Sequence, residues 1–210
     1  MIGPVQSLME SLVKRSASGK VRIIGGKWRS RSLVFPARPE LRPTSDRVRE
    51  TLFNWLGSRV AGAHCLDLFA GSGALGFEAA SRGAAQVVMV ERDSVLMRYL
   101  SEQAHILDAP TVKLIRKDAR RWVQLTRPAS MPPFDIVFLD PPFASDLLVL
   151  LCRQLEDGGW LQSEALVYLE MPERKEEPPL PGNWAVIQSG CAGQVGYYLV
   201  RRCREPRISD

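Results

Sequence analysis

The chain has 210 residues, of which 45% are hydrophobic and 24% are charged. This length accommodates one domain with a full core and excludes two ordinary domains. The longest wholly apolar stretch, near Leu147–Cys152, is far too short to span a bilayer, and the N-terminus lacks the basic and apolar regions of a secretory signal. The four cysteines are widely spaced without a Cys-x-x-Cys pair, so we expect reduced structural thiols, a cytoplasmic location and no membrane partner.

The net charge of +5 is unevenly distributed along the chain. Residues 1–60 hold 12 Lys and Arg against 4 Asp and Glu, whereas residues 61–210 hold 16 against 19. Such a basic segment favours contact with a polyanion, although basic segments also arise for solubility alone. We expect four parts: a flexible N-terminal segment (1–20), a basic extension (21–60), a main domain (61–203) and a C-terminal tail (204–210).

Residues 21–35 predict a β-hairpin in the basic extension. Its strands would be Val21–Ile24 and Lys27–Phe35, joined by a Gly-Gly turn. Alternation along the second strand would place three basic residues on one face, about 7 Å apart and close to the phosphate spacing of a nucleic-acid strand: Lys27, Arg29 and Arg31. We predict nucleic-acid contact there, and a merely exposed strand face is the alternative.

The next segments alternate between helical and apolar patterns. Thr44 and Ser45 predict the N-cap of a helix with Asp46 in its first turn. Short apolar runs alternating with helical patterns then predict a parallel sheet with helices on both faces. The expected strands are Cys65–Phe69, Gln86–Val90, Val112–Ile115, Asp135–Leu139 and Ala165–Leu169. Trp184–Gln188 and Tyr197–Val200 follow without an intervening helix, which predicts an antiparallel pair at the end of the sheet.

A glycine-rich turn follows the first of these parallel strands. Ala70-Gly71-Ser72-Gly73-Ala74-Leu75-Gly76 fits Gly-x-Gly-x-x-Gly, in which the missing side chains let the backbone approach a ligand at a helix N-terminus. Glu91 ends the next strand, 20 residues after Gly71, where a carboxylate can accept both ribose hydroxyls. The spacing indicates an adenosine-containing ligand, either a nicotinamide cofactor or S-adenosylmethionine. A P-loop is excluded because no Gly-Lys-Ser/Thr follows.

Asp67, at the head of this loop, favours S-adenosylmethionine, because a carboxylate repels a pyrophosphate and attracts the ammonium of a methionine moiety. Asp118, after the third strand, can accept the adenine amino group, with capping of the following helix as its alternative role. His64 and His105 are the only histidines, and neither is placed as a general acid for hydride transfer. The predicted cofactor residues are Asp67, Phe69, Gly71, Ser72, Gly73, Glu91, Arg92, Asp118, Ala119 and Asp140.

The motif Asp140-Pro141-Pro142-Phe143 follows the apolar run that ends at Leu139. Two prolines fix their own φ near −65° and hold the neighbouring carbonyls in a set direction. The Asp140 carboxylate and the Pro141 carbonyl can accept the N–H groups of an exocyclic amine, while Phe143 offers a stacking face for a base. Asp-Pro-Pro is also an ordinary turn, but four acids following successive strands converge on one sheet edge. We therefore predict an amino-group methyltransferase with Asp140, Pro141, Pro142 and Phe143 as catalytic residues.

From about residue 20 the chain resembles the RsmD-type methyltransferases, which modify the N2 amine of a guanine in bacterial small-subunit ribosomal RNA. The resemblance is carried by Arg22–Gly26, Arg42–Glu50, Leu66–Gly73 and Asp140–Phe143, of which the first two point to this family and the others occur widely among methyltransferases. It implies a Rossmann-like class I α/β fold with a seven-stranded, mostly parallel sheet and an N-terminal hairpin. It also implies S-adenosyl-L-methionine as methyl donor and a guanine flipped into the pocket.

The resemblance further implies 16S rRNA or the 30S subunit as partner, and it implies that Arg42 and Thr44 lie in a loop closing near the cofactor or the RNA. The predicted RNA-contact residues are therefore Lys27, Arg29, Arg31, Arg42 and Thr44. We expect a monomer. Three alternatives remain open. A DNA or RNA adenine-N6 or cytosine-N4 methyltransferase would use a similar acceptor loop, an RNA-binding assembly factor would keep the fold without turnover, and a nicotinamide oxidoreductase is disfavoured by Asp67.

Overall fold

A computed structural model describes residues 18–36, 38, 41, 43–141, 145–173 and 178–203. Seven strands form one sheet in the order β5-β4-β3-β6-β7-β9-β8. Their bounds are β3 (His64–Asp67), β4 (Gln86–Glu91), β5 (Val112–Arg116), β6 (Phe134–Leu139), β7 (Leu161–Pro172), β8 (Trp184–Ala192) and β9 (Val195–Arg202). The first five strands pair in parallel, and β9 and β8 continue the sheet in antiparallel pairing. The predicted α/β sheet and its antiparallel C-terminal pair are therefore confirmed.

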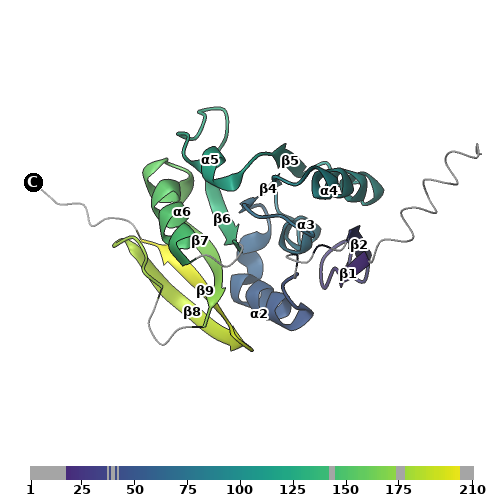
Figure 1. Cartoon of the computed structure of the whole chain (residues 1–210), viewed down its shortest axis with the longest axis horizontal. Coiled ribbons are helices and arrows are strands. Elements are labelled where there is room, and N and C mark those ends of the chain that lie inside the picture. The colour runs from purple at the N-terminus through teal and green to yellow at the C-terminus, as the bar shows by residue number, and fades with distance from the viewer. Residues whose placement is uncertain are drawn as a thin grey trace, which may run out of the picture.

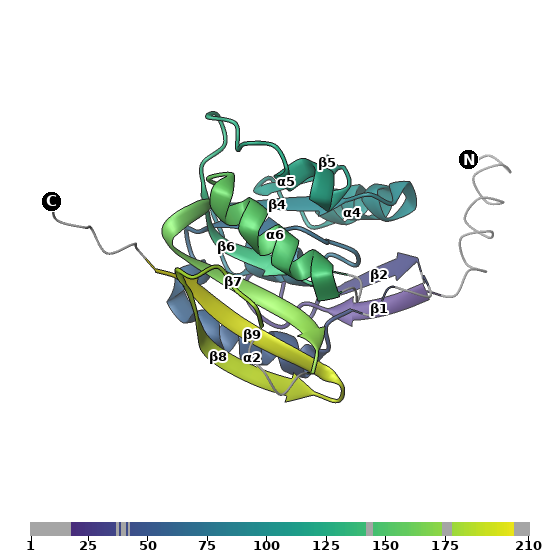
Figure 2. The ribbon, with the colours of Figure 1, turned by 60° about the vertical axis from the view of Figure 1, so that its left-hand side comes forward.

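Helices cover both faces of this sheet (Figures 1 and 2). α2 (Asp46–Leu56), α3 (Ala74–Ser81) and α4 (Ser94–Ile106) pack on one face, and α5 (Ala119–Val123) and α6 (Ser145–Asp157) pack on the other. Successive β6 residues divide between the two cores: Ile136 and Phe138 join the first cluster, whereas Val137 and Leu139 join the second. Burial on both faces explains why the parallel strands read as continuous apolar runs. No helix in the described part of the chain is long and apolar enough to cross a bilayer.

Helix α2 begins as predicted, with Ser45 as its N-cap. The Ser45 hydroxyl accepts a hydrogen bond from the Val48 N–H at 3.4 Å. Arg49, in the first turns of this helix, is fully buried, and its guanidinium donates to the carbonyls of Thr44 and Arg22. This one side chain therefore ties the segment before α2 to the N-terminal strand.

The N-terminal hairpin differs from the expected one. β1 (Ser18–Arg22) pairs antiparallel with β2 (Ser32–Pro36), so strand structure begins three residues before the predicted domain boundary at residue 21. Residues 23–31 form successive turns, and the predicted strand Lys27–Phe35 is wrong in its first half. Lys27, Arg29 and Arg31 consequently do not share one strand face.

Contacts with α3 explain this change. The N–H groups of Ile24 and Gly25 donate to the Glu78 carboxylate at 2.7 and 2.8 Å, and those of Lys27 and Trp28 donate to the carbonyl and hydroxyl of Ser81. These bonds satisfy the backbone groups that a strand ladder would have used. Figure 1 shows the resulting hairpin beside α3 and α4, far from β8 and β9.

Candidate active site

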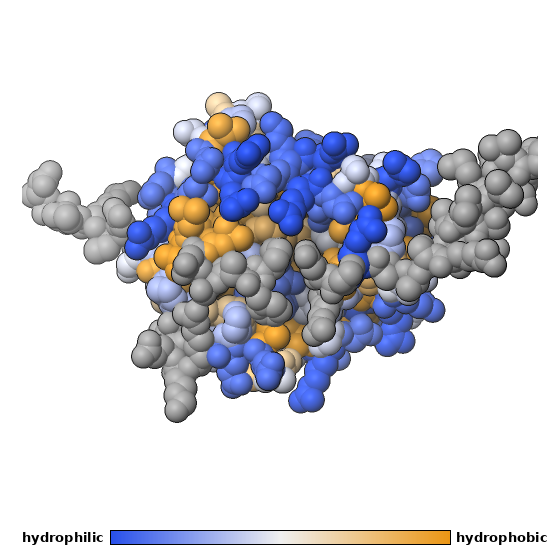
Figure 3. Space-filling view, in the orientation of Figure 1, coloured by the Kyte–Doolittle hydropathy of each residue, from blue (hydrophilic) through white to orange (hydrophobic). Residues whose placement is uncertain are grey.

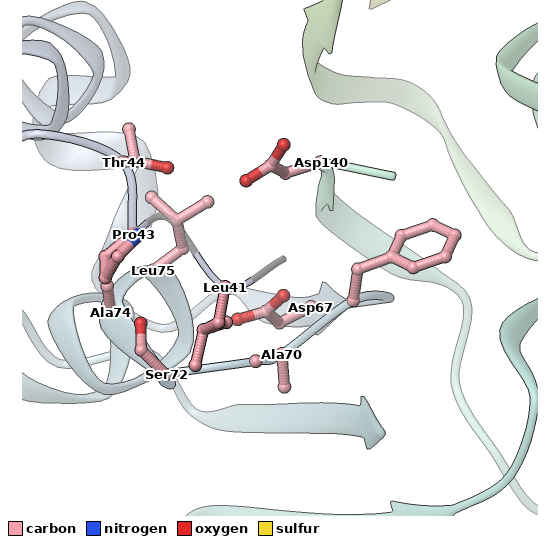
Figure 4. Close-up of a pocket in the computed structure, with 11 residues that line it drawn as sticks. Leu41, Pro43, Thr44, Asp67, Ala70, Ser72, Ala74, Leu75 and Asp140 are labelled. Atoms are coloured by element: carbon pink, nitrogen blue, oxygen red, sulfur yellow. The ribbon is translucent and has the colours of Figure 1, made fainter. Parts of the chain in front are cut away.

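A pocket lies at the carboxyl edge of the sheet, where β3 and β6 end (Figure 4). The glycine loop forms one side and the segment before α2 forms another. Its lining residues are Leu41, Pro43, Thr44, Asp67, Phe69, Ala70, Gly71, Ser72, Ala74, Leu75 and Asp140. The pocket thus brings together three features predicted separately: the cofactor loop, the Asp-Pro-Pro acid and Thr44. Ligands of open α/β sheets bind at such an edge.

The glycine loop has the backbone geometry that only glycine adopts easily. Gly71 and Gly73 have φ values of +51° and +77°. A Cβ on Gly73 would lie 2.6 Å from a Phe77 ring carbon, so a side chain there would displace the loop. Gly73 also stands at the N-cap of α3 and has no side chain to cap it. The Gly76 N–H donates to Asp67, whereas the N–H groups of Ala74 and Leu75 have no hydrogen-bond partner among the described residues and are available to a ligand.

Asp67, at the end of β3, is buried beneath this loop and lines the pocket. Burial raises the pKa of its carboxyl to about 7, the hydrogen bond from the Gly76 N–H at 3.0 Å opposes this rise, and the nearby Glu91 charge adds to it. No salt bridge reaches Asp67 from the described residues. A buried acid of this kind is well suited to the ammonium of an S-adenosylmethionine molecule, since that cation would supply the missing charge.

Asp140 follows β6 and faces the pocket. Figure 4 shows its carboxylate and the Thr44 hydroxyl pointing toward one another, with Asp67 nearby. Burial raises the pKa of Asp140 well above its usual range, and the charges of Glu170 and Asp67 raise it further. Pro141 is buried, whereas Pro142 and Phe143 lie outside the described residues. The stacking role expected of Phe143 therefore stays a prediction.

Glu91 and Asp118 are engaged in local hydrogen bonds. Glu91 accepts the N–H groups of Gly71 at 2.9 Å and of Asp93 at 2.8 Å, and so anchors the glycine loop to the end of β4. Asp118 caps α5 by accepting the Arg121 N–H at 3.3 Å, which is the alternative role foreseen for it. The remaining predicted cofactor residues on this side are Arg92, which is exposed, and Ala119, which is buried. None of these four lines the pocket beside Asp67, because they follow β4 and β5.

Sequence reasoning missed Glu170 and Leu41. Glu170 extends β7, which runs beyond the predicted strand end at Leu169, and 9% of its surface is exposed. The Thr44 and Tyr168 hydroxyls both donate to its Oε1, at 2.6 and 2.9 Å. An acid directly after an apolar strand is the signal that identified Asp67 and Asp140, and it applies equally to Glu170. Leu41 lies in a loop without periodicity, so nothing in the pattern marked it as a pocket residue.

Of the predicted RNA-contact residues that the structure describes, Thr44 lines the pocket, whereas Lys27, Arg29 and Arg31 do not. Lys27, Arg29 and Arg31 are exposed in the turns of the hairpin, and Arg42 lies outside the described residues. A second group of exposed cations gathers around β5 and α5: Lys113, Arg116, Lys117, Arg120 and Arg121. Figure 3 shows the hydrophilic surface along this upper side of the molecule. Basic charge is therefore not confined to the N-terminal third.

The side chains in the described part of the chain suit an organic ligand rather than a metal ion. No group of three His, Cys, Asp or Glu side chains among the residues that the structure describes is arranged to hold a metal ion. Asp67, the loop backbone and the N–H groups of Ala74 and Leu75 instead fit the methionine part of S-adenosylmethionine. When bound, that cofactor supplies an electrophilic methyl group on sulfur.

The chain has relatives along nearly its whole length. Residues 21–201 match the family model described as conserved hypothetical protein 95. Over 187 residues the chain is 46% identical to ribosomal RNA small subunit methyltransferase D of Escherichia coli K12, covering 89% of this chain and 92% of that protein. The protein of the same name from Haemophilus influenzae is 39% identical over 91% of this chain and 98% of its own length.

Solved structures agree with the fold. The yhhF protein of Escherichia coli matches with a TM-score of 0.82 and 42% identity, covering 89% of this chain and all 100% of that one. An RNA methyltransferase from Salinibacter ruber in complex with S-adenosyl-L-homocysteine shares the fold, with a TM-score of 0.59 at 18% identity over 80% of this chain and 98% of that one. The chain thus belongs to the RsmD family of S-adenosylmethionine-dependent methyltransferases, the family that the conserved hypothetical protein 95 model describes.

Proposed function

We propose that the protein methylates the exocyclic N2 amine of a guanine in 16S rRNA within the assembling 30S subunit, using S-adenosylmethionine. One observation carries the proposal: Asp67, which is buried, and Asp140, which is partly buried, face the same pocket, and neither has a cationic partner in the described part of the chain. The names of the two relatives support a small-subunit ribosomal RNA as substrate.

Three predicted residues would hold the cofactor. Asp67 would accept the ammonium group, and Glu91 would accept the ribose hydroxyls from the end of β4. Asp118 would accept the adenine amino group while it caps α5. The hydrogen bond from Gly71 to Glu91 supports this arrangement, because it places the loop backbone and the ribose acceptor next to one another.

Asp140 would orient and activate the amine. The lone pair of a guanine N2 is delocalised into the ring, so the amine is a weak nucleophile. Acceptors at the Asp140 carboxylate and the Pro141 carbonyl would hold its N–H groups and direct the lone pair at the methyl carbon. On transfer of the methyl group from sulfur to nitrogen, Asp140 would take the proton that the amine releases. The raised pKa of Asp140 suits this last role, because it makes the carboxylate a stronger base.

The exposed cations of the hairpin would bind RNA phosphates. Lys27, Arg29 and Arg31 are exposed, and the backbone that carries them is anchored to α3. A fixed backbone presenting flexible cations can position RNA over the sheet edge without reading its sequence.

The deciding experiment uses labelled S-adenosylmethionine with naked 16S rRNA and, separately, with 30S subunits from cells lacking the enzyme. We expect label in N2-methylguanine, identified by mass spectrometry of the nucleosides. Methylated adenine or cytosine, or label in protein, would contradict the guanine assignment. Binding of S-adenosylmethionine without transfer to either substrate would favour the assembly-factor alternative, and binding of NAD instead would favour the oxidoreductase.

A further inference from the structure

Three strands deliver acids to the same face of the sheet. Asp67 pairs with Phe138, and Phe138 pairs with Tyr168, so these three side chains share the face covered by α2 and α3. Leu139, the last residue of β6, pairs with Leu169; Asp140 follows directly after β6, and Glu170 is the next residue of β7. Neighbouring strands lie about 4.8 Å apart, so Asp140 and Glu170 are side by side. The effect of the Glu170 charge on the pKa of Asp140 agrees with this proximity.

Two hydrogen bonds hold Glu170 in one orientation, and one of its carboxylate oxygens is left available as an acceptor. Thr44 and Tyr168 both donate to Oε1, and no hydrogen bond to Oε2 is present from the described residues. No salt bridge in the described part of the chain neutralises Glu170 either. Thr44 itself lines the pocket, so its contact with Glu170 connects this acid to the site. Oε2 of Glu170 can therefore accept a hydrogen bond from a ligand.

The hydrogen-bonding groups of the bases indicate which base could donate to Oε2 of Glu170. Guanine presents two adjacent donors on its Watson–Crick edge, N1–H and the N2 amine. Adenine and cytosine present an amine next to a ring nitrogen that carries a lone pair. Two neighbouring carboxyl acceptors match the guanine edge, whereas the second acceptor would face a lone pair in either of the other bases.

We propose that Glu170 is a specificity-determining residue, which accepts N1–H of the target guanine while Asp140 accepts its N2–H. Thr44 and Tyr168 are positioning residues that hold Glu170 in place. This inference rests on the proposed guanine methylation and adds to it the reason for rejecting adenine and cytosine.

The test compares Glu170→Gln with the wild-type enzyme on two substrates. One is 16S rRNA, assembled into subunits if required, with guanine at the methylated nucleotide, and the other carries 2-aminopurine there. 2-Aminopurine keeps the exocyclic amine but has a lone pair on N1, to which a glutamine amide can donate. We expect kcat/KM on guanine to fall about 10- to 100-fold, by analogy with the loss of a paired base contact. The ratio of guanine to 2-aminopurine methylation should fall more than about tenfold.

Equal losses on both substrates, or no loss on either, would overturn the role of Glu170. A wild-type enzyme that does not methylate guanine would instead contradict the proposed function itself, so the two failures are distinguishable. Tyr168→Phe provides a second measurement if Glu170→Gln does not fold: we expect the same ratio to fall about two- to tenfold, and an unchanged ratio would overturn the proposal. Glu102→Gln, which removes an exposed acid on α4, is the matched control and should leave the ratio unchanged.

Discussion

The hairpin and the pocket differ in where their charged side chains lie and in how these are paired. The hairpin exposes its cations to solvent and is held by one buried acid, Glu78, which receives two backbone N–H groups and pairs with Arg82 at 2.7 Å. Asp67 and Asp140 line the pocket and Glu170 lies beside Asp140; Asp67 and Glu170 are buried, Asp140 is partly buried, and no described residue forms a salt bridge with any of the three. Removing one partner of a buried charge pair is strongly destabilising, whereas a buried acid without a charged partner lowers stability until a ligand supplies the opposite charge. The comparison therefore separates charges that serve structure from charges that serve binding.

The largest effect is expected from removing the Asp140 carboxylate, the proposed acceptor of the amine hydrogen bond and proton. Asp140→Ala should lower kcat about 10²- to 10⁴-fold, because the amine loses both an acceptor and a base. The affinity for S-adenosylmethionine, measured by calorimetry, should change little. Full activity in a methyl-transfer assay would refute the role of Asp140, and Glu102→Gln serves as the unaffected control.

Replacing Glu78, the buried acid that holds the hairpin, should destabilise the protein. Glu78→Gln removes the carboxylate that pairs with Arg82 at 2.7 Å and lies 3.6 Å from Nη1 of the fully buried Arg49, which then keeps, among the described residues, only its ion pair with Asp46. We expect the free energy of unfolding to fall by about 3–5 kcal/mol in urea titrations. A loss below about 1 kcal/mol would show that the ion pair is not what anchors the hairpin.

Asp67→Asn should affect binding and stability in opposite directions. The affinity for S-adenosylmethionine should fall about 10- to 100-fold at pH 8, because the ammonium loses its counter-charge. Burial raises the pKa of Asp67 from its ordinary value of 3.8 to about 7, so the native state binds more protons than the unfolded state between these pH values. The contribution of Asp67 to the free energy of unfolding of the ligand-free protein therefore declines as pH rises from about 4 to 7.

The same substitution should consequently raise the free energy of unfolding of the ligand-free protein by about 2 kcal/mol at pH 8 and flatten its pH dependence. Denaturant titrations at pH 5 and pH 8 measure both quantities. A variant that is less stable than the wild type at pH 8 would contradict the view that Asp67 is kept for its ligand.

The smallest effect is expected from the exposed cations. Replacing Arg29 and Arg31 together by alanine should reduce the slope of log affinity for RNA against log salt concentration by about 1.4–1.8, the value for two phosphate contacts. Unfolding should be unchanged, since both side chains are exposed. Arg98→Ala with Arg201→Ala removes equal charge from α4 and β9 and is the matched control. Equal salt slopes for the two double variants would argue against a specific role for the hairpin.

The hairpin shows where prediction from sequence failed. Alternating residues in 27–35 indicated which side chains are exposed, and Trp28 is indeed buried while Lys27 is exposed. Alternation does not reveal which groups satisfy the backbone. Those partners, Glu78 and Ser81, lie more than 50 residues away and belong to another element.

Local signals in the sequence determined the parallel strands, the N-cap of α2, the glycine loop and the acids at 67 and 140, because strand periodicity, capping and glycine conformations depend on neighbouring residues. Only the tertiary structure decided that Thr44 and Glu170, 126 residues apart, share a hydrogen bond beside Asp140. Strand order, register and the distances between side chains arise when separate segments pack together. The environment of a buried acid therefore depends on contacts that no local pattern contains.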